Sequence, residues 1–346
     1  MTRGTLRALL VPFVGLALLC AWVYFALDHH EAAELSAHAQ WWLVVAAIAC
    51  SFTSYFFICM ALLVIGRTLG VRRVTAQMFM IVTFVSLTLN HVISLGVAGY
   101  SARVLLLRRV GESPGTVLAA SLLHSYLTTL VMVALLPIGL GAIARSEAVP
   151  PAGTAALQVA TAVSTAAVLA MTVGLVSRRL RIIGLAFIGR AGRFIPGGHA
   201  EGLERALQDL DVGLTTAFRA VRQQPAAALA PVVLTLLDWT AVLAAYWLCL
   251  LAVGQSIEPR VLIAGFAIGM NVGVVSLVPG GVGVQEGSQA GVLAILGVPF
   301  GTALLASVLF RFVYYLLPFL VSLPLYAIVL RPLAPDSAEA APATAP

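Results

Sequence analysis

The apolar run from Val261 to Leu296 is interrupted by the stretch Pro279-Gly-Gly-Val-Gly-Val-Gln-Glu-Gly287. Glycine and proline weaken or break regular helices, and this run exceeds the ~20 residues that one helix needs to cross a bilayer. We therefore predict that the run enters the membrane, turns and returns as a broken helical hairpin. A second run, Ala76 to Leu107, has the same excess length and glycines of its own at Gly96 and Gly99.

The composition around these two runs indicates a membrane protein. Of the 346 residues, 61% are hydrophobic and only 10% are charged, whereas a soluble domain carries roughly 25% charged residues. Six further apolar runs each suit one crossing, and they are Leu6–Leu27, Trp41–Ile65, Thr116–Ile143, Thr154–Val176, Ala226–Val253 and Thr302–Leu330. The predicted fold class is an all-α polytopic membrane protein with about six full spans plus two re-entrant or broken helical hairpins.

The arginines predict how the chain is oriented. They gather in alternate loops, and cytoplasmic loops carry the excess of basic residues. Both termini are therefore predicted to be cytoplasmic, in a multi-pass protein of the bacterial inner membrane, with Arg103 among the inner arginines at the edge of the first hairpin. The net charge of +6 accordingly orients the chain and does not indicate nucleic acid as a partner.

The two halves of the chain resemble each other. Gly111, Gly115, Thr116 and Ser121 align in constant register with Gly297, Gly301, Thr302 and Ser307, and Gly96-x-x-Gly99 matches Gly280-x-x-Gly283 after a two-residue shift. Three crossings in each half predict an inverted-topology repeat, an arrangement that recurs in transporters. We predict one membrane domain over residues 1–330, with halves of about 6–143 and 154–330, an inner amphipathic segment at 199–223 and a disordered tail at 331–346.

Polar residues within the apolar runs are the candidates for a site, because ionisable groups inside a bilayer are costly. Asn90, Arg103, Glu286 and Arg311 are predicted to bind a lipid headgroup. Glu286 is expected to pair with Arg311 or Arg103, which leaves one guanidinium for an anionic group such as phosphate, and helix N-termini at the breaks add positive charge. The alternative is that Glu286 and Arg311 form only a structural ion pair.

Further residues complete the predicted site. The backbone breaks predicted to line it are at Gly96, Gly99, Gly280, Gly281 and Gly283. Secondary candidates are Asp238, Asn271, His124, Tyr314 and Tyr315. For Asp238 and His124, a packing role is the competing interpretation.

The second-half motif resembles a known family. The stretch from Pro279 to Gly287, then Gly297-Val-Pro299, then Arg311-Phe-Val-Tyr-Tyr-Leu-Leu-Pro318 is similar to the transmembrane region of lysylphosphatidylglycerol synthases, also called the flippase-like domain. Asn90, Gly99 and Arg103 fit the looser first-half motif, while Ser94 and Tyr100 depart from the family's usual proline and acidic residue. The resemblance covers roughly Leu6 to Leu330, and it implies re-entrant helices and a role in moving lipids between leaflets.

The expected function follows from these residues and this resemblance together. We expect an inner-membrane lipid-handling protein, a translocator or carrier of an anionic phospholipid, glycolipid or polyprenyl phosphate. The alternatives are an integral-membrane lipid-modifying enzyme or an accessory scaffold for an envelope lipid pathway. The chain is expected to be a stand-alone member without the soluble aminoacyltransferase domain, to have no ATPase motif, enzyme activity, cofactor or metal, and to have membrane lipids and envelope-lipid biosynthesis proteins as partners.

Overall fold

The protein is described here from a computed structural model. The structure describes residues 40–92, 97–145, 150–177, 225–276 and 278–330, together with scattered positions between 179 and 215. The predicted first span at 6–27, most of the amphipathic segment at 199–223, the tail at 331–346 and Gly96 lie outside the described residues.

Every regular element in the described part of the chain is helical. In chain order they are α3 (Trp41–Leu69), α4 (Ala76–Val92), α5 (Val97–Arg109), α6 (Pro114–Ala144), α7 (Pro151–Val176), α10 (Pro225–Ala252), α11 (Pro259–Val275), the 3₁₀ turn η1 (Pro279–Gly281), α12 (Val284–Ile295), α13 (Phe300–Arg311), the π-helical turn η2 (Phe312–Leu316) and α14 (Leu317–Leu330). The two interrupted runs of the sequence form the pairs α4–α5 and α11–α12.

Five of these segments can cross a membrane by length and composition. They are α3, α6, α7, α10 and the continuous segment from α13 through η2 into α14. These five coincide with five of the six predicted crossings, while the shorter apolar helices α4 and α11 belong to the hairpins. The chain is therefore an all-α, multi-pass membrane protein, as predicted.

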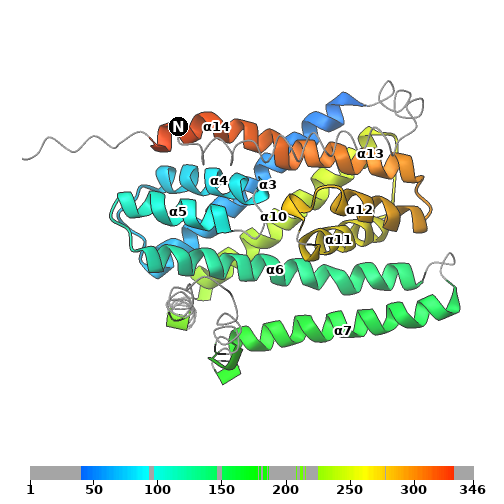
Figure 1. Cartoon of the computed structure of the whole chain (residues 1–346), viewed down its shortest axis with the longest axis horizontal. Helices are drawn as coiled ribbons and strands as arrows, with labels where there is room; N and C mark the ends of the chain where they lie inside the picture. The colour runs from blue at the N-terminus through cyan, green and yellow to red at the C-terminus, as the bar shows by residue number, and fades with distance from the viewer. Residues whose placement is uncertain are drawn as a thin grey trace, which may run out of the picture.

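The helices are arranged as two halves that run in opposite directions. In Figure 1 the hairpin α4–α5 lies at one end of the bundle and the hairpin α11–α12 lies toward the other, and α3 and α10 cross in the middle. α3 and α10 share the most extensive contact between elements, and they supply much of the largest core cluster. The end of α4 and the start of α5 thus lie toward the centre of the molecule, as does the turn η1 between α11 and α12 (Figure 1).

Helix boundaries confirm the repeat that the sequence predicts. α5 ends at Arg109 and α12 at Ile295, α6 begins at Pro114 and α13 at Phe300, and each second-half boundary follows its counterpart by 186 residues. The same shift relates Gly111 to Gly297, whose φ angles of 82° and 92° place both in the left-handed region after a helix. The two halves therefore have the same local fold and not only similar composition.

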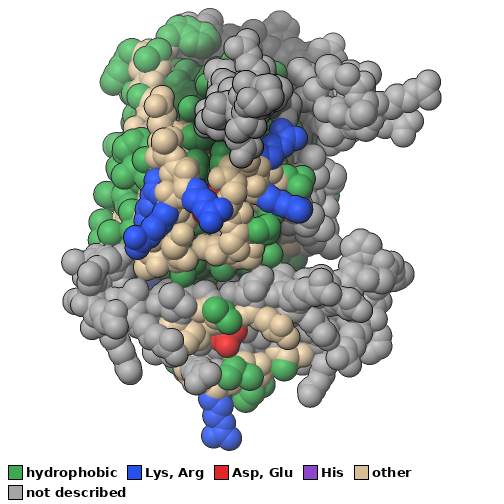
Figure 2. Space-filling model, turned by 90° about the vertical axis from the view of Figure 1, so that its left-hand side faces the viewer, with side chains coloured by type: hydrophobic (Ala, Val, Ile, Leu, Met, Phe, Trp, Pro, Cys, Tyr) green, Lys and Arg blue, Asp and Glu red, His purple; other side chains and the backbone are tan. Residues whose placement is uncertain are grey.

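Arginine side chains gather at the end of the bundle where α3 and α5 finish (Figure 2). Arg72, Arg73, Arg108 and Arg109 are exposed there. The α3–α4 loop and the α5–α6 loop are connected here, because Glu112 accepts hydrogen bonds from the backbone N–H groups of Arg73 and Val74. This face carries the charge asymmetry on which the predicted orientation rests.

Candidate functional site

The second hairpin breaks because three glycines adopt conformations that other residues disfavour. Gly280, Gly281 and Gly283 have φ angles of 62°, 63° and 80°, in the region where a Cβ is strained. α12 then starts at Val284, and its first turn is capped when the Gly283 N–H donates to Glu286 Oε2 at 2.7 Å. The N-terminus of α12 is thus neutralised by the protein's own carboxylate.

Arg311, the last residue of α13, connects this helix to the glycine break and to the first turn of α12. Its Nε donates to Glu286 Oε1, its Nη1 to the Gly280 carbonyl at 2.9 Å and its Nη2 to Gln285 Oε1 at 3.1 Å. The guanidinium also lies over the Tyr315 ring, 4.7 Å from its centroid. All three nitrogens of Arg311 are engaged, so the structure pairs Glu286 with Arg311 and makes them a clasp for the second hairpin.

The first hairpin is closed by close approach and by an amide cap. The Gly99 N–H donates to Asn90 Oδ1 at 2.7 Å. A Cβ at Gly99 would collide with the Ser86 carbonyl and with the Asn90 side chain, so glycine is needed for α5 to lie this close to α4. The N-terminal region of α5 therefore also receives a cap from the protein.

Arg103 lies in the protein interior. The arginine pattern of the sequence predicted it at the edge of the first hairpin, with the arginines of the cytoplasmic side. Its side chain is 1% exposed. Its Nε donates to Ser86 Oγ at 3.0 Å and its Nη1 to Ser121 Oγ at 2.8 Å. Among the described residues, no carboxylate pairs with Arg103, and its Nη2 has no hydrogen-bond partner. Arg103 therefore has one side-chain nitrogen without a hydrogen bond from the described residues, whereas each nitrogen of Arg311 donates to the protein.

The clasp of the second hairpin has an uncharged counterpart in the first. Tyr100 and Ser125 stand 186 residues before Glu286 and Arg311, and the Tyr100 hydroxyl is hydrogen-bonded to Ser125 Oγ. The unusual tyrosine of the first-half motif thus makes the same connection, from the hairpin helix to the following span, without charge.

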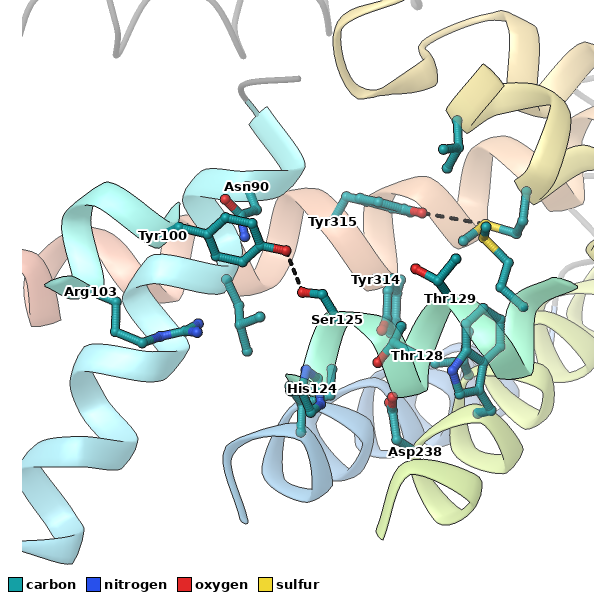
Figure 3. Close-up of a pocket in the computed structure, with 17 residues that line it drawn as sticks. Asn90, Tyr100, Arg103, His124, Ser125, Thr128, Thr129, Asp238, Tyr314 and Tyr315 are labelled. Carbon is teal, nitrogen blue, oxygen red and sulfur yellow. Dashed lines mark hydrogen bonds between the residues drawn. The ribbon is translucent and has the colours of Figure 1, made fainter. Parts of the chain in front are cut away.

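A cavity of about 290 Å³ lies between the first hairpin and the central helices (Figure 3). Its polar and aromatic walls include the predicted residues Asn90, Arg103, His124, Asp238, Tyr314 and Tyr315, and they also include Tyr100, Ser125, Thr128, Thr129 and Trp239. Glu286, Arg311 and Asn271 are not among the residues that line it. Asn271 instead donates to the carbonyls of Ala267 and Met132, which ties α11 to α6.

Several polar atoms around the cavity lack partners within the described part of the chain. Besides Arg103 Nη2, these buried atoms are His124 Nε2, Thr128 Oγ1 and Trp239 Nε1. Buried polar atoms are normally hydrogen-bonded, and an exception calls for an explanation such as a bound water or ligand. Four residues that line one cavity thus each have a buried polar atom without a partner in the described part of the chain, which favours a binding site at this cavity.

Asp238 brings a carboxylate to the same cavity. It is 3% exposed, and its Oδ1 accepts a hydrogen bond from Ser54 Oγ at 2.5 Å. Ser54 Oγ also lies 3.1 Å from the Tyr314 hydroxyl. Tyr314 belongs to η2, a π-helical turn directly after Arg311, and such turns often occur at functional sites.

The sequence reasoning missed a polar stripe on α6. Ser121, His124, Ser125, Thr128 and Thr129 follow one another at alternating spacings of three residues and one residue, which places them on one face of a helix. This pattern inside an apolar run is a signal that could have identified the cavity wall. Ser54 and Trp239 gave no comparable signal, because the polar residues beside them do not form a stripe of this length along one helix face.

The fold and the site together define a polytopic membrane protein with two broken hairpins of opposite direction and a cavity that has polar and aromatic residues in its wall. The sequence model of the lysylphosphatidylglycerol synthase TM region matches residues 8–322, and the chain belongs to this family. It is therefore a multi-pass membrane protein of a lipid-related family. A comparison with curated proteins found no significant match.

Proposed function

We propose that this protein binds the phosphate-bearing headgroup of a membrane lipid in the central cavity and moves that lipid between leaflets. The observation that carries the proposal is the buried guanidinium of Arg103, which lines the cavity and whose Nη2 has no hydrogen-bond partner in the described part of the chain. An arginine without a carboxylate partner is costly in a low-dielectric interior. A phosphate group at Nη2 would offset that cost and would match the donor geometry of a guanidinium.

The remaining cavity wall supports a headgroup as the occupant. The His124, Thr128 and Trp239 atoms without partners add further hydrogen-bonding positions. A volume of about 290 Å³ corresponds to roughly ten water molecules at ~30 Å³ each, which accommodates a phosphate and a short polar group. The acyl chains would remain outside, among the apolar helix faces.

The inverted repeat supports translocation as the mode of action. Transporters with such repeats hold their substrate between the two halves and open alternately to either side. The polar stripe of α6 lies on a spanning helix and faces the cavity from Ser125 to Thr129. A headgroup that leaves Arg103 would therefore meet hydroxyl groups and not only apolar side chains.

Leaflet exchange in proteoliposomes tests this proposal. We expect the full chain to accelerate exchange of a fluorescent phosphatidylglycerol, and we expect Arg103→Gln and the near-isosteric Thr128→Val to lower the rate, Arg103→Gln by about tenfold or more. Arg109→Gln, at an exposed arginine of the basic face, is the matched control and should exchange at the wild-type rate. Wild-type rates for both cavity variants, in protein with an unchanged unfolding temperature, would overturn the proposal.

A lipid-modifying enzyme is the second candidate, because Asp238 and His124 both line the cavity. Glu286, the other predicted site residue with a carboxylate, is paired with Arg311 and does not line this cavity. Incubation of the reconstituted protein with defined phospholipids, followed by mass spectrometry, separates the two functions. A new lipid species that depends on Asp238 and His124 would favour the enzyme, and unchanged lipid masses with active exchange would favour the translocator.

The predicted location in a bacterial inner membrane, with cytoplasmic termini, is part of this proposal. Its support is the exposed arginine face at the end of α3 and α5 (Figure 2), since basic residues mark cytoplasmic loops. Labelling of single introduced cysteines from either side of intact cells tests it. A cysteine at Arg109 should react only after the inner membrane is permeabilised, whereas one at Glu258 should react in cells with a permeable outer membrane alone.

A further inference from the structure

We propose that Asp238 forms a second subsite of the cavity, which selects lipid headgroups that carry a hydrogen-bond donor, a hydroxyl or an ammonium group, beside the phosphate. The inference rests on the proposed function, because it assumes that the headgroup lies in the cavity. It adds the chemical class of headgroup that the cavity accepts and names the residue that makes the choice.

The carboxylate of Asp238 has acceptor capacity left. It is 3% exposed and lines the cavity, and Ser54 provides the one hydrogen bond that it receives from the described residues. No arginine or histidine of the described residues forms an ion pair with it. An ionised carboxylate offers about four lone-pair positions, so most of the acceptor positions of Asp238 await a donor from within the cavity.

The neighbours of Asp238 fix its role as an acceptor. Ser54 has one hydroxyl proton, which it donates to Asp238 Oδ1, so Ser54 accepts at its 3.1 Å contact with the Tyr314 hydroxyl. The hydrogen-bond chain therefore ends on the carboxylate. With Asp238 ionised, the group that completes this end of the cavity is a donor.

The rest of the cavity presents the opposite chemistry. Arg103 Nη2 and Trp239 Nε1 are donors only, and both are without partners in the described part of the chain. In the view of Figure 3, Arg103 reaches in from α5 and Asp238 from α10, with side chains of α6 between them. The cavity thus offers donors for a phosphate and, separately, an acceptor for a second group.

This arrangement discriminates between headgroups. A lipid with phosphate alone satisfies Arg103 but leaves the carboxylate without a donor and adds a second negative charge to the same cavity, which is costly in a low-dielectric site. A headgroup with a hydroxyl or ammonium group satisfies both ends. Sites that hydrogen-bond a substrate group reject analogues that lack it, because their own polar atoms are then left unpaired.

The test uses the purified full chain and an equimolar mixture of four lipids. At a pH at which the phosphate of phosphatidic acid is fully ionised, phosphatidic acid and phosphatidylcholine have no donor, phosphatidylglycerol has hydroxyls and phosphatidylethanolamine has an ammonium group. Lipids retained after delipidation and exchange are quantified by mass spectrometry. We expect wild type to enrich phosphatidylglycerol, phosphatidylethanolamine or both over the other two by about tenfold, and the enriched lipid identifies the donor as hydroxyl or ammonium.

The variants separate this inference from the proposed function. Asp238→Asn is isosteric and keeps an acceptor for Ser54, and it should reduce the tenfold enrichment to less than about threefold. Glu258→Gln makes the same change on an exposed carboxylate outside the cavity and should retain the wild-type preference. A preference that Asp238→Asn leaves intact, or a wild type that retains phosphatidic acid equally well, overturns this inference alone. Unchanged lipid retention by Arg103→Gln overturns the proposed function.

Discussion

The two hairpins occupy equivalent positions in the repeat, yet they are held by different forces. The second hairpin is fixed by an ionic clasp, in which Arg311 binds Glu286, Gln285 and the Gly280 carbonyl. At the equivalent place the first hairpin has only the neutral bond between Tyr100 and Ser125. The same position of the repeat is thus bridged by an ion pair in the second half and by two hydroxyl groups in the first.

The arginines of the two halves differ in the same way. Arg311 has used its nitrogens on the protein, while Arg103 has kept one. The residue 186 positions after Arg103 is Gln289, a buried amide without charge. Asn90, Tyr100 and Arg103 all line the cavity, whereas the α11–α12 hairpin contributes only Met270 and Val274. The comparison indicates that the second hairpin provides rigidity, whereas the first hairpin contributes residues to the cavity wall.

The largest effect is expected from breaking the clasp. Glu286→Ala leaves Arg311 as an unpaired buried charge, and removing one partner of such a pair costs about 3–5 kcal/mol. Chemical unfolding in detergent micelles measures this loss. Glu258→Ala, which breaks the exposed pair with Arg260, is the matched control and should cost less than about 1 kcal/mol.

A double variant shows whether the clasp acts through charge. Glu286→Gln with Arg311→Met removes both charges, and it should recover part of the stability lost in Glu286→Ala, because no unpaired ion remains. A double variant as unstable as Glu286→Ala would mean that the packing of these side chains, and not their pairing, holds the second hairpin.

The next largest effect concerns the close approach of α4 and α5. Gly99→Ala places a methyl group against the Ser86 carbonyl and the Asn90 side chain, and such overpacking costs about 1–3 kcal/mol. Gly291 is a helical glycine of α12 with open space around it, so Gly291→Ala should be neutral or stabilise by about 0.5–1 kcal/mol. The same unfolding measurement compares the two variants, and equal effects would contradict the close packing of the first hairpin.

Much of the fold could be predicted from the sequence, because it depends on local signals. Apolar length and glycine interruptions located both hairpins and the described spans, and the constant register located the repeat. The pairing of Glu286 with Arg311 was one of two predicted arrangements. These features need only residue type and spacing along the chain.

The site was harder to predict, because it depends on which way each helix face turns. The arginine bias placed Arg103 with the arginines of the cytoplasmic side, at the edge of the first hairpin. The rotation of α5 instead points its side chain into the protein interior, to Ser86 and Ser121. Ser54 and Asp238 meet only because α3 packs along α10. The polar stripe on α6 was visible in the sequence but was not used to predict the cavity wall. Contacts across the repeat therefore limit sequence-based prediction here more than the helices themselves do.

A transplant of the clasp tests whether the two halves share one geometry. Tyr100→Glu and Ser125→Arg put the second-half pair at the equivalent positions of the first half. Ser125→Arg alone adds an unpaired charge beside the cavity and should destabilise the protein, while the double variant should recover a coupling energy on the order of 1 kcal/mol or more. A double-mutant cycle of unfolding free energies measures the coupling, and simple additivity would show that the sites are not geometrically equivalent.

The smallest effect is expected at the native counterpart of the clasp. Tyr100→Phe removes one neutral hydrogen bond to Ser125, and such a bond contributes about 0.5–1.5 kcal/mol. The loss should fall at the low end of this range, because both side chains are only partly buried and line the cavity, where water can replace the lost partner. Chemical unfolding of Tyr100→Phe and Glu286→Ala under the same conditions measures the difference between their losses of stability. A Tyr100→Phe variant that loses as much stability as Glu286→Ala would mean that hydroxyl groups hold the first hairpin as firmly as charge holds the second. The second hairpin would then not be the more rigid of the two.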